Sequence, residues 1–217
     1  MSSIHIKFFL KSKKQANLNR LSTVTVPGEL KFVILRHAER VDLVFGQQWL
    51  DTSFDQYGNY RRTNLNMPHK VPPRGSKRDF YGDSPITEIG KIQAKFTGEA
   101  LKTGQEPINF HYCYVSPSLR SIQTAHHVLE SMGIEKQCKL RIEPSLFEFL
   151  GWYEKGTPIF LSPEALINFG YNIDFNYKPL MTADKLQPEE NYTDYYIRSF
   201  NLVKHMTNLH QREGKRR

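Results

Sequence analysis

Residues 31–40 read KFVILRHAER, an uninterrupted apolar run that leads directly into two arginines on either side of a histidine. A continuous run of this kind is typical of a strand that is covered on both faces in a parallel sheet. Further apolar strands are predicted at 110–115 and 139–142. The first strand therefore delivers a charged cluster to one edge of a sheet.

Helical periodicity alternates with these strands. Helices are predicted over 87–102, 119–132, 163–169 and 193–211, with Thr87 as an N-cap and Gly133 as a C-terminal stop. Apolar side chains follow one face of each of the three longer helices: Ile89, Ile92, Phe96 and Ala100; Leu119, Ile122, Leu129 and Met132, facing inward; and Tyr196, Phe200, Val203 and Met206. The order of elements predicts a three-layer α/β/α sandwich with a mostly parallel sheet.

The chain reads as one folded domain with a lead-in. Its 217 residues are enough to bury a core, and 12% aromatic residues argue against disorder. Residues 1–30 are polar and basic, so we expect a flexible lead-in with at most a short edge strand at 4–10. The remainder, 31–217, forms the domain. Within it, the segment 41–83 is long for a connection, and such connections tend to be functional.

The formal charge of +8 has two interpretations. It is either a solvated basic surface, with basic residues gathered near both ends of the chain, or a field that attracts phosphorylated substrates and other anions. No basic module interleaved with aromatic residues indicates a nucleic-acid binder. With two cysteines, no membrane-length apolar run and no convincing signal peptide, we expect a cytoplasmic or nuclear protein without a membrane span.

The cluster at 36–40 has the chemistry of a phosphate site. A phosphate monoester is a dianion, and planar guanidinium groups such as those of Arg36 and Arg40 bind it through paired, charge-assisted hydrogen bonds. Cations on both sides disfavour protonation of His37, and a neutral imidazole nitrogen is a competent nucleophile toward phosphorus. The alternative, a surface histidine beside solvated arginines, is disfavoured by the buried strand that precedes it.

Two later segments are expected at the same edge, where ligands bind in parallel sheets. Residues 116–120 follow the second strand and begin a helix. The N-terminus of this helix favours an anion, and Arg120 adds a third guanidinium there. Glu148 follows the third strand between two phenylalanines, and apolar neighbours favour a protonated carboxyl that acts as a general acid. The simpler alternatives are an exposed helix arginine and a loop glutamate that faces solvent.

Cysteine and metal chemistry is not expected. Cys113 precedes Arg120 at nearly the spacing of a cysteine-phosphatase loop, but the spacing differs and Cys113 lies inside a predicted strand, so we interpret it as a core residue. The other histidines show no metal-ligand spacing. His126 and His127 are adjacent on a helix, where neighbouring side chains diverge. We therefore predict no metal and no cofactor.

Together these motifs resemble the histidine phosphatase superfamily, also called phosphoglycerate mutase-like, whose Arg-His-x-x-Arg signature stands here at 36–40. More narrowly, the chain resembles the phosphatase domains of the ubiquitin-associated and SH3 domain-containing proteins (suppressors of T-cell receptor signalling) and the ecdysteroid-phosphate phosphatases. The likeness spans about 31–205. The stretches that carry it are RHAERVDLVFGQQWL from Arg36, NLNMP from Asn64, DSPIT from Asp83, SPSLRSIQTA from Ser116 and EPSLFEF from Glu143.

The resemblance implies a phosphohistidine mechanism. His37 would take the phosphoryl group and Glu148 would donate a proton to the leaving group. The phosphate oxygens would be held by Arg36, Arg40 and Arg120. Substrates would be a phosphorylated protein, such as one carrying phosphotyrosine, or a phosphorylated small molecule, entering past 41–83, and the assembly implied is a homodimer. The leading residues are too few for ubiquitin-binding and SH3 domains, so their partners are not expected.

Two departures from the family pattern stand out. Ala38 replaces a glycine common in this branch, with little expected effect. The family also carries a second catalytic histidine after a further strand beyond the last long helix, and no histidine here stands in that motif. We therefore expect a C-terminally incomplete domain, with unpaired backbone groups beside 31–35.

Two functions remain open after this. The chain is either a phosphomonoester hydrolase that works through His37, or a weak or inactive truncated pseudophosphatase that binds phosphate or regulates another protein. A phosphoglycerate mutase proper is disfavoured by the match over 41–83.

Overall fold

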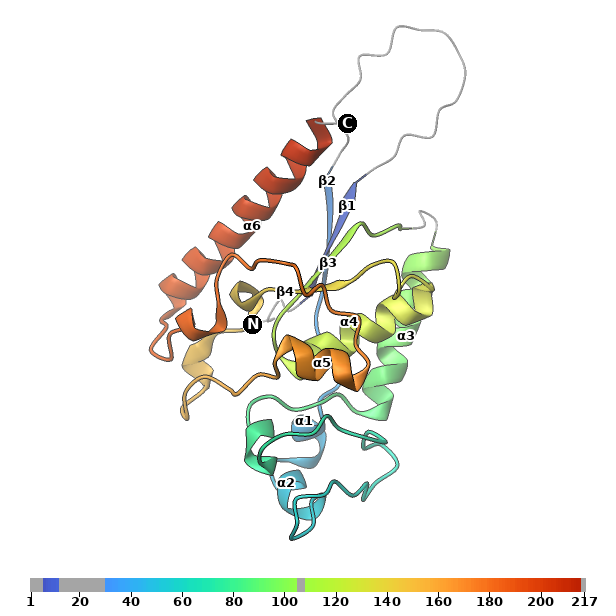
Figure 1. Cartoon of the computed structure of the whole chain (residues 1–217), viewed down its shortest axis with the longest axis vertical. Helices are drawn as coiled ribbons and strands as arrows, with labels where there is room; N and C mark the ends of the chain where they lie inside the picture. Colours follow the sequence, from blue (N-terminus) through green and yellow to red (C-terminus); the bar gives the residue numbers. More distant parts are fainter. Residues whose placement is uncertain (1–5, 12–29, 105–107, 216–217) are drawn as a thin grey trace, which may run out of the picture.

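The computed structural model describes residues 6–11, 30–104 and 108–215, and the side chains from 30 onward up to 211, apart from the gap at 105–107. Its sheet has the strand order β2-β1-β3-β4. The strands are β1 (Ile6–Lys11), β2 (Leu30–Leu35), β3 (Tyr112–Val115) and β4 (Leu140–Ile142). β1 runs antiparallel to both neighbours and β3 is parallel to β4, so β2, β3 and β4 share one direction (Figure 1).

β1 occupies an inner position of the sheet. It pairs with β2, where Ile6 lies opposite Leu35, and with β3, where Ile6 lies opposite Val115. The expectation of an edge strand at 4–10 is wrong, because this strand is paired on both sides. It supplies backbone partners for one side of β2. The rest of the expected lead-in lies outside the described residues.

β2 is an edge strand among the described residues, and the covering of both faces that its apolar run predicts is only partial. Val33 and Leu35 pack against the larger core cluster and Phe32 packs against a second one, but Ile34 is 48% exposed. The inner neighbour of β2 is β1, and no described strand pairs with its other side. β2 nevertheless leads into residues 36–40 at the edge of the sheet where we expected them.

Helices cover both faces of the sheet, which confirms the three-layer plan (Figure 1). Helices α3 (Glu88–Thr103) and α4 (Leu119–Met132) pack on one face and α6 (Tyr192–Lys215) on the other. Side chains alternate along β3 accordingly. Cys113 belongs to the cluster under α4, whereas Tyr114 packs with Leu202 and Met206 of α6.

The two central helices begin and end as predicted. The Thr87 hydroxyl accepts a hydrogen bond from the backbone N–H of Gly90 at 2.9 Å and caps α3. α4 ends at Gly133, which adopts the left-handed conformation at φ 75°. The four α4 side chains expected to face inward are all buried: Leu119, Ile122, Leu129 and Met132.

The apolar faces predicted for α3 and α6 are largely exposed. On α3, Ile92 is 51% and Phe96 70% exposed, and the buried positions are the small residues Gly90, Ala94 and Gly98. On α6, Phe200 is 66% exposed. The buried residues of α6 recur every four positions and include two polar side chains: Arg198, Leu202, Met206 and His210.

The remaining elements are short and lie in the loops. The segment 41–83 contains α1 (Val41–Phe45), α2 (Trp49–Thr52) and the 3-10 helix η1 (Lys77–Phe80), and Trp49, Phe54 and Phe80 pack their rings together there. After β4 come η2 (Pro144–Leu146), η3 (Leu150–Trp152), α5 (Pro163–Phe169) and η4 (Ala183–Lys185). α5 has the predicted bounds. Within the described ranges, none of the helices has the length and apolarity needed to cross a bilayer.

Candidate active site

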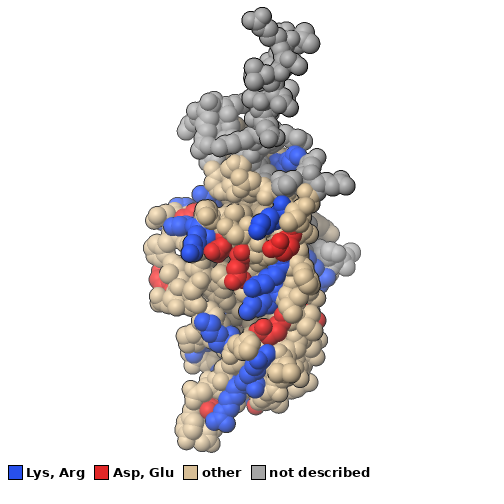
Figure 2. All heavy atoms as spheres, turned by 90° about the vertical axis from the view of Figure 1, so that its right-hand side faces the viewer, with Lys and Arg blue, Asp and Glu red and all other residues tan. Residues whose placement is uncertain are grey.

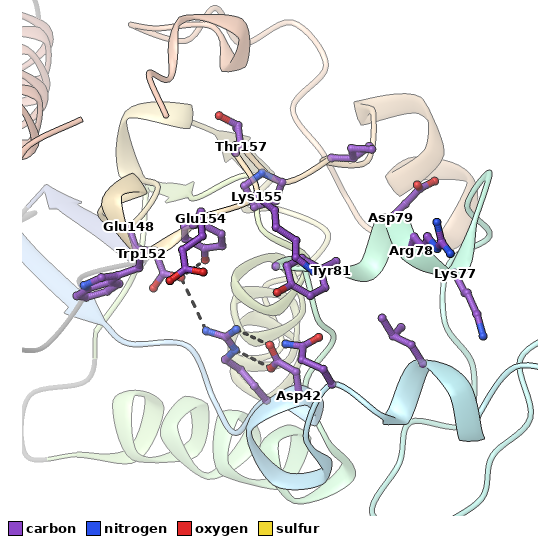
Figure 3. A pocket seen from close by; sticks show the side chains of 18 of the residues that line it. Asp42, Lys77, Arg78, Asp79, Tyr81, Glu148, Trp152, Glu154, Lys155 and Thr157 are labelled. Atoms are coloured by element: carbon purple, nitrogen blue, oxygen red, sulfur yellow. Dashed lines mark hydrogen bonds and ion pairs between the residues drawn. The ribbon is translucent and has the colours of Figure 1, made fainter. Parts of the chain in front are cut away.

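A cavity of about 1070 Å³ opens at the end of β2 (Figure 3). Three stretches of chain line it, within 36–51, 77–82 and 148–159. Four of the five predicted site residues stand on its wall: Arg36, His37, Arg40 and Glu148. The fold therefore brings these four side chains to one cavity, at the strand ends where they were predicted to meet, although they are far apart in the sequence.

The loop 36–40 is fixed by the helices behind it. The backbone N–H of Ala38 donates to the Thr124 hydroxyl of α4 at 3.0 Å. The Glu39 carbonyl accepts from the N–H of Thr87 at 2.9 Å, and the Glu39 carboxylate accepts from the Thr87 hydroxyl at 2.6 Å. The histidine between these anchors is therefore held in place by α3 and α4 together.

His37 is buried and its ring orientation is set by the backbone. Its Nδ1 lies 2.8 Å from the carbonyl oxygen of Ala38. A carbonyl only accepts hydrogen bonds, so Nδ1 carries the proton in this contact and Nε2 carries the lone pair of the neutral ring. This is the tautomer that a nucleophilic histidine attacking through Nε2 requires.

Arg40 is held between two carboxylates. It donates from Nε and Nη2 to the two oxygens of Asp42, at 2.9 and 2.6 Å, and its Nη1 lies 3.8 Å from Glu148 Oε1 (Figure 3). Burial works to lower the pKa of Arg40, but the hydrogen bonds and charge of Asp42, together with the charge of Glu148, raise it overall. Arg40 is thus a permanent cation with a fixed orientation on the cavity wall.

Glu148 has a polar environment and not the apolar one that its sequence neighbours predict. Its Oε1 accepts hydrogen bonds from Arg120 Nη2, at 2.7 Å, and from the Tyr153 hydroxyl. Of the flanking rings, Phe147 packs against Tyr153 and lies under the Arg120 guanidinium, and Phe149 stacks on Tyr192. Two cations and a hydroxyl around a carboxylate favour its ionised form. In this arrangement Glu148 is therefore an anion that joins two arginines.

Arg120 is fully buried behind Glu148 and is not among the residues that line the cavity. Its Nη1 donates to the carbonyl of Gly82 at 3.1 Å, and its Nε has no hydrogen-bond acceptor among the described residues. The N-terminus of α4, where we expected an anion, is met by a protein carboxylate: Asp83 accepts from the N–H of Leu119 at 2.7 Å. Burial raises the pKa of Asp83, against the charges of Arg74 and Arg120.

The lining of the cavity carries both signs of charge. It includes five cations, Arg36, Arg40, Lys77, Arg78 and Lys155, and five anions, Asp42, Asp51, Asp79, Glu148 and Glu154, so five minus five leaves no net charge. Basic and acidic side chains are also mixed over the face shown in Figure 2. The excess positive charge of the chain is therefore not concentrated in this cavity.

Three polar residues of the site were not predicted from the sequence. Asp42 follows Arg40 by two positions, and that spacing is a signal for an ion pair that sequence reasoning could have used. Tyr153 and Asp83 have no comparable signal, because their roles depend on contacts made after folding. Burial is the main cause that raises the pKa of Tyr153, so its hydroxyl stays a donor to Glu148.

Outside the cavity, the cysteine expectation is confirmed and one histidine argument is wrong. Cys113 is fully buried, and burial raises the pKa of its thiol well above the ordinary range. His126 and His127 do not diverge: with Glu130 they place potential ligand atoms within 4.8 Å of one another. Burial lowers the pKa of His126, and lowers that of His127 to about 4 despite its hydrogen bond to Glu130.

Comparison with known proteins agrees with the motifs. The family model of the histidine phosphatase superfamily, branch 1, matches residues 75–213. The chain is 42% identical over 187 residues to ubiquitin-associated and SH3 domain-containing protein B of Homo sapiens, covering 85% of this chain and 28% of that protein. It is 38% identical over 176 residues to the ecdysteroid-phosphate phosphatase of Drosophila melanogaster, covering 80% and 23%. The chain spans less than a third of the length of these relatives.

A solved structure shares the fold. The ecdysone phosphate phosphatase of Bombyx mori, determined in complex with tungstate, superposes with a TM-score of 0.72 at 32% sequence identity. The match covers 82% of this chain and 67% of that one. From its motifs, its architecture and these similarities, the chain belongs to the histidine phosphatase superfamily, branch 1.

Proposed function

We propose that this chain is a phosphomonoester hydrolase of the histidine phosphatase type, with His37 as its nucleophile. The observation that carries the proposal is the position of His37. It stands on the same cavity wall as Arg36 and Arg40, with Nδ1 directed at the Ala38 carbonyl. The names of the Drosophila and Bombyx relatives, both phosphatases of ecdysteroid phosphates, support the same reaction class.

The reaction runs in two steps. Nε2 of His37 forms a bond to phosphorus while the bond from phosphorus to the ester oxygen breaks, and Arg36 and Arg40 bind the phosphoryl oxygens. Water then attacks the phosphohistidine, which releases inorganic phosphate and restores the imidazole. The cation pair lowers the barrier because it meets the charge spread over the phosphoryl oxygens in the transition state.

Glu148 donates the proton to the leaving oxygen, and Arg120 adds the third guanidinium. In the structure, Glu148 forms ion pairs with Arg120 and Arg40. Both proposed roles require these contacts to rearrange. An arriving phosphate dianion competes for the same guanidinium groups. When the phosphate takes over these hydrogen bonds, Glu148 loses the cations that keep it ionised and becomes able to hold a proton.

The substrate is larger than phosphate itself. A cavity of about 1070 Å³ lies just above the usual range of about 300–1,000 Å³ for sites that bind drug-sized molecules. Its rim carries the half-exposed Trp152 and Tyr81, on which an apolar or aromatic leaving group packs. We propose that the substrate is a phosphorylated protein, with phosphotyrosine as the side chain, or a phosphorylated small molecule.

A second function is favoured by one observation. Of the histidines that the structure describes, His37 is the one that lines the cavity. A site with one histidine, and with its acid tied to two arginines, binds phosphate more readily than it turns over a monoester. The alternative is therefore a weak or inactive pseudophosphatase that binds a phosphorylated partner.

Hydrolysis of p-nitrophenyl phosphate separates these functions. The hydrolase predicts turnover, slow but measurable, that is abolished in His37→Ala and retained in His69→Ala, which changes an exposed histidine outside the cavity. Robust turnover in His37→Ala would overturn the role of His37. Binding of tungstate by calorimetry without any turnover would favour the phosphate-binding alternative.

A further inference from the structure

A second cluster of reactive side chains lies on α4, apart from the residues that line the phosphate cavity. It consists of His126, His127 and Glu130, whose potential ligand atoms all lie within 4.8 Å of one another. Glu130 stands one helical turn after the two histidines, and its Oε2 lies 2.9 Å from His127 Nδ1. The two rings are 5.0 Å apart between centroids at an interplanar angle of 64°, so they turn toward the same side.

We propose that these three side chains bind a divalent transition metal ion, with Zn²⁺ as the best fit. Two imidazoles and one carboxylate form a donor set that zinc accepts in three-ligand sites with a fourth position open to water. Hard cations such as Mg²⁺ and Ca²⁺ prefer oxygen ligands and are disfavoured here. The proposal does not rest on the phosphatase function.

The rings are already placed for such a site. Both imidazoles are partly buried, and His126 packs edge-on against Tyr171 at 5.3 Å between centroids. The Tyr171 hydroxyl accepts a hydrogen bond from Gln123 Nε2 at 3.1 Å, which fixes the tyrosine ring in turn. Rings that are ordered before binding lose little side-chain entropy when the metal arrives.

Only a small contraction is needed. Metal–ligand distances of about 2.0–2.2 Å place tetrahedral ligand atoms roughly 3.3 Å apart, so the cluster must close by about 1.5 Å at most. The Glu130 side chain is 42% exposed, which leaves it able to make this movement. The histidines therefore define the position, and the carboxylate adjusts to it.

A neighbouring cation opposes the metal. The ammonium of Lys95, on α3, lies 3.2 Å from Glu130 Oε2, one of the two carboxylate oxygens available to the metal. Lys95 is 42% exposed and has room to turn into solvent, but its charge competes with the ion for the carboxylate. Removing this charge should therefore strengthen metal binding, an effect that a metal bound elsewhere would not show.

Zinc binding to the full chain tests the proposal. After treatment with EDTA, titration with ZnCl₂ by calorimetry should give one bound ion per chain, which excess Mg²⁺ does not displace. His127→Ala and Glu130→Gln should each weaken binding by roughly 10-fold or more. His69→Ala and His205→Ala, two exposed histidines outside the cluster, are the matched controls and should leave the affinity unchanged.

Lys95→Gln should have the opposite effect and bind zinc more tightly than the wild type does. Circular dichroism verifies that each variant is folded before it is titrated. The proposal is overturned if the wild type shows no saturable zinc binding. It is also overturned if His126→Ala and His127→Ala together leave binding intact, or if Lys95→Gln weakens it.

Discussion

Arg40 and Asp42 form an ion pair through two parallel hydrogen bonds, from Nε at 2.9 Å and from Nη2 at 2.6 Å. The Asp42 side chain is 3% exposed and that of Arg40 is 14% exposed, so little water competes with the pair. The backbone N–H of Asp42 also donates to the Ser84 hydroxyl at 3.1 Å, which ties the aspartate to the 77–84 segment. Asp42 therefore determines where the Arg40 guanidinium lies on the cavity wall.

Asp42→Asn should weaken the phosphate site without removing any residue that touches the substrate. A charge-assisted hydrogen bond contributes about 1.5–3 kcal/mol, so we expect kcat/KM to fall roughly 10- to 100-fold. The measurement is steady-state hydrolysis of p-nitrophenyl phosphate. The control is Asp55→Asn, which removes the charge from an ion pair with the 73% exposed Arg61, outside the cavity. An equal loss in both variants would contradict the positioning role of Asp42.

Glu148→Gln should show a loss that depends on the leaving group. A p-nitrophenolate leaves without protonation, whereas the oxygen of an alkyl phosphate needs a proton as the bond breaks. We expect a small loss with p-nitrophenyl phosphate and a loss of about 10²- to 10⁴-fold with an alkyl phosphate. Because Glu148 also bonds Arg120 and Tyr153, a structural role alone would reduce both rates equally, and that outcome would count against Glu148 as the acid.

The loop that carries Glu148 depends on a buried arginine of α6. Arg198 donates to both oxygens of Glu190, at 2.7 Å each, and to the carbonyls of Ser145 and Phe147, at 2.9 Å each. Arg198→Leu leaves the buried Glu190 carboxylate without its cation, which costs about 3–5 kcal/mol. Urea unfolding should show this loss. Lys204→Ala, on an exposed face of α6, is the control and should change the free energy of unfolding little.

Element boundaries and strand ends were predictable because local chemistry specifies them. Gly133 adopts the left-handed conformation that ends α4, and Thr87 caps α3 with its own hydroxyl. The position of His37 followed in the same way, because an apolar strand that stops at a charged cluster places that cluster at the edge of the sheet.

Packing partners were not predictable from periodicity. On α3 the apolar stripe with Ile92 and Phe96 has the pattern of a core face, but both side chains are exposed. The helix packs instead through Gly98, where an added Cβ would lie 2.4 Å from the Val128 carbonyl oxygen of α4. Close approach of two helices selects small residues, which carry no hydrophobic signal. The polar surroundings of Glu148 could not be predicted from its sequence neighbours either, because its partner Arg120 is distant in the sequence.

The alkaline stability of the protein should depend on Tyr60. Burial raises the pKa of Tyr60 to about 12, against the charge of Arg62, and its hydroxyl donates to the Pro68 carbonyl at 2.7 Å. The folded state thus favours the neutral phenol. The contribution of the neutral Tyr60 side chain to the free energy of unfolding is fully present below about pH 10, the pKa of tyrosine in the unfolded chain. It is lost as the pH rises toward 12.

Tyr60→Phe should remove that part of the pH dependence. The effect is no more than about 1 kcal/mol because the ring is partly exposed and screened by solvent. Urea unfolding of both proteins at about pH 8 and about pH 11 measures it. Tyr57→Phe, which changes an 80% exposed ring in the same segment, is the matched control. Identical pH dependence in the wild type and Tyr60→Phe would show that Tyr60 is not responsible.

The most direct test of the account is to trap the phosphoryl group on the protein. The chain is mixed with a ³²P-labelled phosphomonoester, quenched within a single turnover in alkali, where phosphohistidine survives, and digested for mass spectrometry. We predict an acid-labile phosphate on the peptide that contains His37, absent from His37→Ala and present in His69→Ala. Label on another residue, or hydrolysis with no phosphorylated protein at any quench time, would contradict the central claim.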